Sequence, residues 1–207
     1  MNMSSGRLVV PLAGALAISA TLGGQQKPAA FQIREATIAQ IHAALKARTI
    51  TCRGLVEQYL ARIDALDKKG PALNAIVIVN PRALEEADEK DRALRQGSLS
   101  GALFCIPAIV KDNFETIGQQ SAAGSLSLQG FISTRDAFQV RRIKDAGAIV
   151  IAKSNMAEFA FSPYETVSSI LPGYTKNPYA LDRVTAGSSG GTAAAVAALP
   201  DGIDVTE

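Results

Sequence analysis

The 207-residue sequence contains little of several residue types on which common active sites depend. It has one histidine, His42, which lies in a helical pattern, so we expect neither a metal site nor a Ser-His-Asp triad. Tryptophan is absent, aromatic residues make up 5%, and no basic stripe carries interleaved aromatics, which argues against nucleic-acid binding. The net charge of +2 gives no reason to expect a strongly anionic partner.

Cysteine is nearly as scarce, with only Cys52 and Cys105 and no CxxC pair. Cys52 precedes a helical pattern, and Cys105 lies in an apolar pattern typical of a strand. An exported chain could pair the two in a disulfide, whereas two buried thiols fit these surroundings equally well. The sequence leaves both possibilities open.

Long hydrophobic runs are missing except near the N-terminus. A short basic start precedes an apolar stretch over residues 8–22, and small residues follow up to Gly24. This pattern is typical of a secretory signal peptide and is short for a membrane span. We therefore expect residues 1–24 to be a signal peptide, cleaved between positions 20 and 30. The mature chain would be exported, periplasmic or extracellular, without a stable membrane span.

The remaining sequence has the composition of a globular protein, with 47% hydrophobic and 19% charged residues overall. Helical spacing of apolar residues predicts helices over residues 37–48, 51–63, 80–96 and 136–146. Apolar, largely β-branched runs predict buried strands over residues 74–79, 103–110 and 148–152. Because strands alternate with helices, we expect an α/β fold.

Residues 185–198, TAGSSGGTAAAVAA, place two serines between glycines, directly before a helix-favouring run. Glycine permits positive φ and close approach, and a helix that starts here directs free N–H groups at the serines. The pattern favours an activated hydroxyl or a bound anion, with a flexible linker as the alternative by composition. A phosphate-binding loop would need a lysine after the glycines, where Thr192 and Ala193 stand instead.

Lys111 directly follows the apolar residues 106–110. A lysine at the end of a strand can extend its amine into water. Alternatively, burial lowers the pKa of such an amine, which can then take a proton from a serine hydroxyl. Ser-Lys pairs do this work where histidine is unavailable, so the near absence of histidine fits the second interpretation.

Several segments, in order, resemble those of the amidase signature family. They are residues 55–63, 106–113 (IPAIVKDN), 136–158 and 177–195. The resemblance extends from about residue 36 to residue 198. It implies an α/β fold with part of a large mixed β-sheet covered by helices, in which residues 36–198 form the N-terminal part of an amidase domain.

The resemblance also implies a function, the hydrolysis of carbon–nitrogen amide bonds by a Ser–cis-Ser–Lys triad. Lys111 matches the base, and Ser188 matches the bridging serine that follows a cis peptide bond. The supporting positions are the small residues beside this serine: Gly187, Ser189, Gly190 and Gly191. The implied substrate is a small-molecule amide, and no cofactor or metal is implied.

The sequence departs from the family at its end. The family's nucleophile is a third serine, whose expected position falls beyond Glu207, and no serine follows Ser189. Residues 199–207 form an atypical tail in which Pro200 would end the helix early. We therefore expect a truncated form without the nucleophile, inactive alone, arising either as a fragment or from a shifted reading frame.

Two alternative functions remain open. In the first, Ser188 or Ser189 is itself the nucleophile, with Lys111 as its base. In the second, the chain is a non-catalytic, exported α/β module that binds a ligand or a partner.

Overall fold

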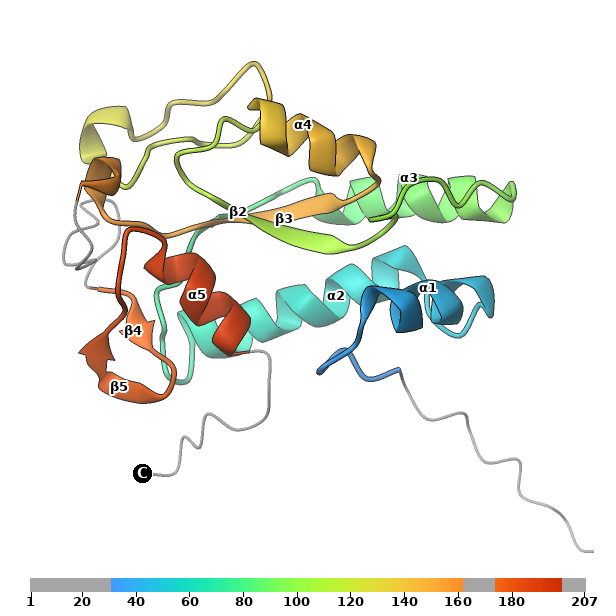
Figure 1. The fold of residues 1–207 in the computed structure, drawn as a ribbon, viewed down its shortest axis with the longest axis horizontal. Coiled ribbons are helices and arrows are strands. Elements are labelled where there is room, and N and C mark those ends of the chain that lie inside the picture. Colours follow the sequence, from blue (N-terminus) through green and yellow to red (C-terminus); the bar gives the residue numbers. More distant parts are fainter. Residues whose placement is uncertain (1–30, 162–173, 199–207) are drawn as a thin grey trace, which may run out of the picture. The chain divides into compact units, whose positions relative to one another are not determined.

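The computed structural model describes residues 31–161 and 174–198. A three-stranded mixed sheet lies at the centre of this part of the chain (Figure 1). Its strands, in spatial order, are β1 (Ile76–Val79), β3 (Ile149–Ser154) and β2 (Pro107–Lys111). β1 runs antiparallel to β3, whereas β2 runs parallel to it. Two short strands, β4 (Lys176–Asn177) and β5 (Ala180–Val184), form a separate antiparallel pair.

Helices cover both faces of the sheet (Figure 1). On one side lie α1 (Ile38–Lys46), α2 (Cys52–Ile63) and α5 (Gly190–Ala197), and on the other lies α4 (Phe138–Asp145). The helix α3 (Ala83–Arg95) packs against α2 and β3. Three short helical turns complete the described elements: η1 (Asp64–Lys68), η2 (Leu126–Leu128) and η3 (Glu158–Ala160). The predicted α/β fold class is confirmed.

The first two helices begin where the sequence predicts. Thr37 caps α1, its hydroxyl accepting a hydrogen bond from the Gln40 amide, and Thr51 caps α2 through the Gly54 amide. Such caps satisfy backbone donors that a helix start leaves without partners. The apolar stripes of these helices pack on β3 in the main core, which includes Leu45, Leu55, Val56, Ile149 and Ile151.

Two predicted elements start at least three residues later in the structure. The strand predicted over residues 103–110 is wrong in its first half, because β2 starts at Pro107. Cys105 has a φ of +62°, and its amide donates to the Gly147 carbonyl at 3.1 Å, so this segment turns instead of extending. The helix predicted from residue 80 starts at Ala83, after a turn in which the Asn80 side chain accepts from the Arg82 amide at 2.9 Å.

A disulfide joins Cys52 to Cys105, with their Cα atoms 5.4 Å apart. Both residues are fully buried. The turn at Cys105 thereby fastens the start of α2 to the segment that leads into β2. Of the two possibilities left open by the sequence, the structure contains the disulfide.

The pairing between β2 and β3 contains one irregularity. Ala108 pairs with Val150 and Ile109 pairs with Ala152, so Ile151 is an extra residue in β3. Successive residues of a strand point to opposite faces, and an extra residue shifts this alternation. Val150 packs with Val140 of α4, and the Lys153 amine lies on the same face, whereas Ser154 contacts α5.

The predicted signal peptide, residues 1–24, and the predicted tail, residues 199–207, lie outside the described residues. The proposed domain limits therefore stay predictions.

Candidate active site

The last residue of β2, Lys111, meets the two serines that precede α5. Its Nζ donates hydrogen bonds to Ser188 Oγ at 2.7 Å and to Ser189 Oγ at 2.8 Å. The Lys111 side chain is half-buried. The fold thus brings together the two motifs singled out in the sequence, which lie 77 residues apart.

The backbone around Ser188 has an unusual geometry. The peptide bond between Gly187 and Ser188 is cis. The Ser188 carbonyl accepts a hydrogen bond from the Ala157 amide at 3.3 Å, and α5 begins two residues later, at Gly190. The backbone of Ser188 is therefore held between the start of α5 and the segment that follows β3.

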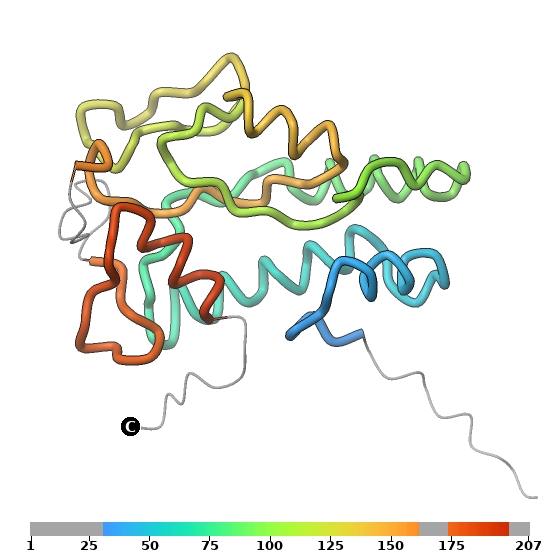
Figure 2. The backbone as a smooth tube through the Cα atoms, viewed as in Figure 1, coloured from blue at the N-terminus to red at the C-terminus, as the bar shows by residue number. Residues whose placement is uncertain are grey.

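The packing of the start of α5 against neighbouring backbone segments requires glycine at position 191. A Cβ atom there would lie 2.5 Å from the Ala75 carbonyl oxygen and from the Asn155 amide nitrogen and carbonyl oxygen. The Gly191 amide donates to the Asn155 carbonyl at 3.2 Å. Figure 2 shows the three backbone segments that converge here, those before β1, after β3 and at the start of α5. Close approach explains this glycine, because no side chain fits between these backbones.

Asn155 holds the same junction with its side chain. Its Nδ2 donates to the Asn74 carbonyl at 3.2 Å and to Thr175 Oγ1 at 2.8 Å, while its backbone amide donates to the Ala75 carbonyl at 2.7 Å. Asn155 is fully buried. It fixes the segment against which the serine-bearing loop rests.

A hollow of about 320 Å³ lies beside the lysine–serine contact. Lys111, Ser189 and Thr192 line it from one side, and residues of α4, among them Val140, line the other. Thr192 also shares a hydrogen bond of 2.6 Å with Ser154, which ties α5 to β3. A small molecule in this hollow would lie beside the Lys111 side chain, which is one of the lining residues.

Behind the site, on the opposite face of the sheet, two charged side chains are fully buried. Lys153 Nζ lies 3.6 Å from Asp112 Oδ1, and neither side chain is exposed. Burial lowers the pKa of Lys153 to about 8, against the attraction of the Asp112 carboxylate. Burial likewise raises the pKa of Asp112, and the Lys153 charge opposes that rise.

No sequence motif assigns a role to this buried pair. A signal was present, since two apolar strands each end on a charged residue, Lys111-Asp112 in one and Lys153 in the other. Charged side chains are rarely fully buried unless they are paired.

A family model described as "Amidase" matches residues 54–200. The chain belongs to the amidase family. It is 42% identical over 166 residues to a glutamyl-tRNA(Gln) amidotransferase subunit of Alkalilimnicola ehrlichii, covering 80% of this chain and 33% of that protein. The corresponding subunit of Acinetobacter baumannii is 44% identical over 163 residues, covering 78% of this chain and 32% of that protein.

Solved structures agree with this assignment. The peptide amidase of Stenotrophomonas maltophilia superposes with a TM-score of 0.72 at 41% identity, over 79% of this chain and 34% of that chain. The glutamyl-tRNA(Gln) amidotransferase subunit of Thermotoga maritima gives a TM-score of 0.62 at 31% identity, over 81% and 33% of the two chains. The resemblance inferred from the motifs and the amidase fold are confirmed. The chain spans about a third of the length of the curated relatives it matches.

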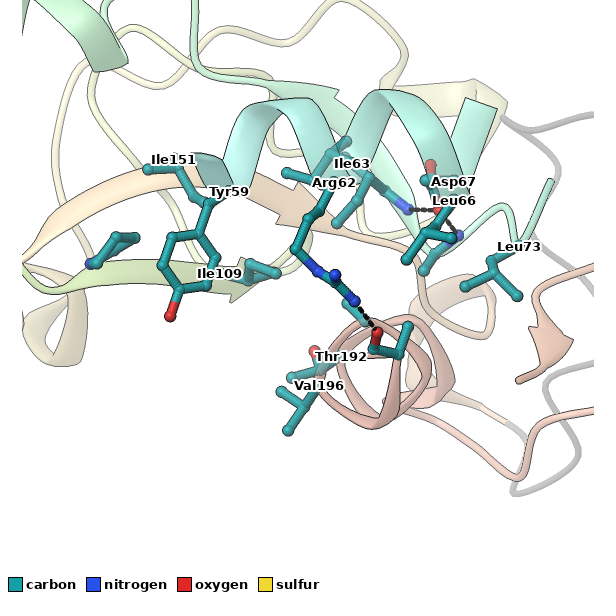
Figure 3. A pocket seen from close by; sticks show the side chains of 15 residues that line it. Tyr59, Arg62, Ile63, Leu66, Asp67, Leu73, Ile109, Ile151, Thr192 and Val196 are labelled. Atoms are coloured by element: carbon teal, nitrogen blue, oxygen red, sulfur yellow. Dashed lines mark hydrogen bonds between the residues drawn. The ribbon is translucent and has the colours of Figure 1, made fainter. Parts of the chain in front are cut away.

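This amidase-family chain has a second, largely apolar pocket of about 180 Å³ between α2, η1 and α5 (Figure 3). Tyr59 and Ile63 line it from α2, and Val196 lines it from α5. Arg62 crosses it and donates to the Ala198 carbonyl at 2.5 Å, at the end of α5. Asp67 accepts hydrogen bonds from the backbone amides at the start of β1.

The histidine of the amidase-family chain lies on α1, where His42 Nε2 donates to the Phe104 carbonyl at 3.0 Å. Within residues 31–161 and 174–198, no three His, Cys, Asp or Glu side chains are grouped as ligands for a metal ion. No helix in that same part of the chain combines the length and apolarity of a membrane span.

Proposed function

We propose that this chain supplies two of the three groups of a site that hydrolyses amide bonds. In this proposal Lys111 is the base and Ser188 is the relay. The contact of 2.7 Å between Lys111 Nζ and Ser188 Oγ is the observation that carries it. Membership of the amidase family supports the same reaction.

The reaction needs a neutral Lys111 amine, which then accepts the Ser188 proton in place of donating to the hydroxyl. Ser188 in turn takes the proton of a nucleophilic hydroxyl, whose oxygen attacks the carbonyl carbon of the amide. The carbon–nitrogen bond breaks, and the leaving nitrogen receives a proton through Ser188. Water then attacks the acyl-enzyme, releases the carboxylic acid and restores the hydroxyl.

We propose further that the nucleophile is a serine outside these 207 residues. No serine follows Ser189 in the sequence, and the chain spans about a third of its relatives. A base and a relay without a nucleophile and oxyanion donors lack the groups that supply most of the stabilisation in acyl transfer. We therefore expect this chain alone to release no ammonia from amides. Its substrate in the complete enzyme is a small-molecule amide bound beside Lys111, without a cofactor.

A chimera tests this function directly. Residues 31–198 would replace the matching part of the Stenotrophomonas maltophilia peptide amidase, to which the chain is 41% identical. Lys111→Ala and Ser188→Ala should each lower kcat by about ten-thousandfold or more, the range seen when one member of a catalytic triad is removed. Lys176→Met, in a lysine that bonds the Pro71 carbonyl at 2.9 Å, serves as the matched control. An active chimera that keeps its rate in both alanine variants would refute the assignment.

A second catalytic arrangement uses Ser188 or Ser189 itself as the nucleophile. It is supported by the position of Ser189, whose Oγ lies 2.8 Å from Lys111 Nζ. A fluorophosphonate probe that labels either serine in the 207-residue chain would favour this arrangement. An unlabelled chain would leave Ser188 as the relay.

The apolar pocket in Figure 3 favours another class of function, an α/β module that binds a ligand or partner without catalysis. A stable, monomeric product with cooperative unfolding, together with an inactive chimera, would favour the module. Aggregation of the isolated chain with an active chimera would favour the amidase.

We also propose that the chain is exported. The apolar N-terminal stretch and the disulfide between Cys52 and Cys105 support this location independently, because disulfides persist in oxidising compartments. N-terminal sequencing of the product from a bacterial host should find a start between residues 20 and 30 in the exported fraction. A full-length product retained in the cytoplasm would contradict export.

A further inference from the structure

The buried pair behind the site is connected to both members of the lysine–serine contact. Asp112 directly follows Lys111, and its side chain lies on the opposite face of the sheet, 3.6 Å from Lys153. The Asp112 backbone amide donates to the Ser154 carbonyl at 3.1 Å, which continues the pairing of the two strands beyond Lys111. Any shift of Asp112 therefore moves the residue that carries the base.

Lys153 holds the loop that leaves β2. Its Nζ donates to the Phe114 carbonyl at 2.9 Å, the Gln120 carbonyl at 3.0 Å and Ser121 Oγ at 3.1 Å. These three bonds use all the donors of an ammonium group. The three hydrogen bonds of this fully buried lysine hold together residues near the start and the end of the loop.

Asp112 holds the far end of the same loop. Its Oδ2 accepts from the amides of Ala122 at 3.2 Å and Gly124 at 3.4 Å. Lys153 and Asp112 thus fix residues 112–124 from both ends, and their charges offset each other in a buried setting.

A short chain of backbone contacts links this loop to Ser188. The Ala123 carbonyl accepts from the Phe159 amide at 2.8 Å. Two residues earlier, the Ala157 amide donates to the Ser188 carbonyl at 3.3 Å. The loop therefore supports the segment on which the cis-linked serine rests.

We propose that Lys153 and Asp112 are a positioning pair, which holds Lys111 through the strand end and Ser188 through the loop, so that the amine meets the serine hydroxyl. This role rests on the proposed function of Lys111 and Ser188. Neither Lys153 nor Asp112 contacts the hollow beside the base. Their effect is exerted through the backbone from the opposite face of the sheet.

Competitive acetylation of the full 207-residue chain tests the pair without requiring turnover. Trace acetic anhydride at a series of pH values, read by mass spectrometry, gives the reactivity and pH profile of each lysine. Lys69, which is 70% exposed, is the internal standard, and Lys176, bonded to the Pro71 carbonyl, reports on folding. Lys176→Met is the matched control for loss of a structural lysine.

Asp112→Asn is the deciding variant, because asparagine keeps an oxygen for the two loop amides and removes only the charge. We expect the reactivity of Lys111 relative to Lys69 to rise about threefold or more, with an altered pH profile and an unchanged Lys176. Lys153→Met should raise it by about tenfold, the size expected when hydrogen bonds from a charged group are lost. Lys176→Met should leave Lys111 unchanged.

Two results in Asp112→Asn would overturn the proposal. An unchanged Lys111 would show that the pair does not act on the base, and a parallel rise of Lys111 and Lys176 would reduce the pair to a general stabiliser of the fold. Because labelling requires no hydrolysis, an inactive chimera that carries a responsive Lys111 would refute the proposed function and leave the positioning role standing.

Discussion

Two lysines lie at the carboxyl ends of neighbouring parallel strands and have opposite surroundings. Lys111, at the end of β2, reaches two serine hydroxyls and lines an open hollow. Lys153, near the end of β3, is fully buried and donates to two carbonyls and a hydroxyl, beside a carboxylate. Both lie at the same end of the sheet, where β2 and β3 finish. The Lys111 side chain faces α5, whereas the Lys153 side chain faces the loop that follows β2.

The surroundings of the two lysines suit the same type of side chain to two different uses. A partly exposed lysine can exchange its proton with a reacting group, and its removal leaves no buried charge behind. A fully buried lysine organises the backbone, and its removal leaves a buried carboxylate without its counter-charge. The surroundings, and not the residue type, decide which lysine is suited to chemistry.

The largest expected effect on the free energy of unfolding comes from replacing the buried lysine, Lys153. Lys153→Met should lower the free energy of unfolding by about 3–5 kcal/mol, because Asp112 then remains as an unpaired buried charge. Denaturant unfolding followed by circular dichroism measures this change. The double variant Lys153→Met with Asp112→Asn removes both charges and should recover part of the loss. A double variant less stable than Lys153→Met would argue against charge pairing.

The contact between Lys111 and the serines can be disrupted without replacing either lysine. Gly191→Ala places a Cβ atom 2.5 Å from backbone atoms of Ala75 and Asn155, so α5 must move. We expect a loss of about 3 kcal/mol or more and separation of Lys111 from the serines. Thermal unfolding and Lys111 acetylation measure the two effects.

Gly118→Ala is the control for Gly191→Ala. An added Cβ at Gly118 meets no atom within 4 Å, and the φ of +73° leaves only the cost of the left-handed backbone. That cost is about 1–2 kcal/mol. Equal losses in the two variants would show that close packing at Gly191 is unimportant.

A pH series sharpens the contrast in a single protein. The pKa of Lys153 is lowered to about 8 in the folded chain from a reference of 10.5, so between these values the unfolded chain binds more protons. The free energy of unfolding should therefore rise with pH over this window on account of Lys153, by up to about 3 kcal/mol. Denaturant midpoints at pH 7.5 to 10.5 would show the rise. It should be missing from the double variant that lacks both charges.

The smallest effect is expected at the proposed base. Lys111→Met should change the free energy of unfolding by about 1 kcal/mol or less, because the side chain is half-buried and its partners are hydroxyls that can turn to water. The same denaturant experiment measures it. A loss as large as that of Lys153→Met would remove the distinction between the two lysines.

Much of the fold was predictable from local patterns. The starts of the first two helices, the apolar runs that form β1, β2 and β3, and their alternation with helices follow from periodicity, and the structure has them. The contact between Lys111 and the serines rested on family motifs, because composition alone cannot bring together segments 77 residues apart. Cys105 was assigned to a strand from its apolar neighbours, and only tertiary contacts of its backbone produce the turn.

The contact between Lys153 and Asp112 could not be predicted from the alternation of side chains along a strand. Counting by twos from Ile149, which packs in the main core, would place Lys153 on that same face. The structure places its amine on the face of α4, because Ile151 is an extra residue in β3. A pairing irregularity of this kind depends on the neighbouring strand and has no signature in the strand's own sequence.

That extra residue belongs to the main core and leaves the residues beyond it in register with β2. With Ile151 present, Ser154 faces α5 with Lys111, and Lys153 faces the loop. Deleting Ile151 would leave the pairs Val110–Lys153 and Lys111–Ser154 intact, so the amine and the hydroxyl would keep their faces and the main core would lose one isoleucine. The unmatched residue thus lets β3 add a second isoleucine to the core while its partners on β2 still set the faces of the two polar residues beyond it.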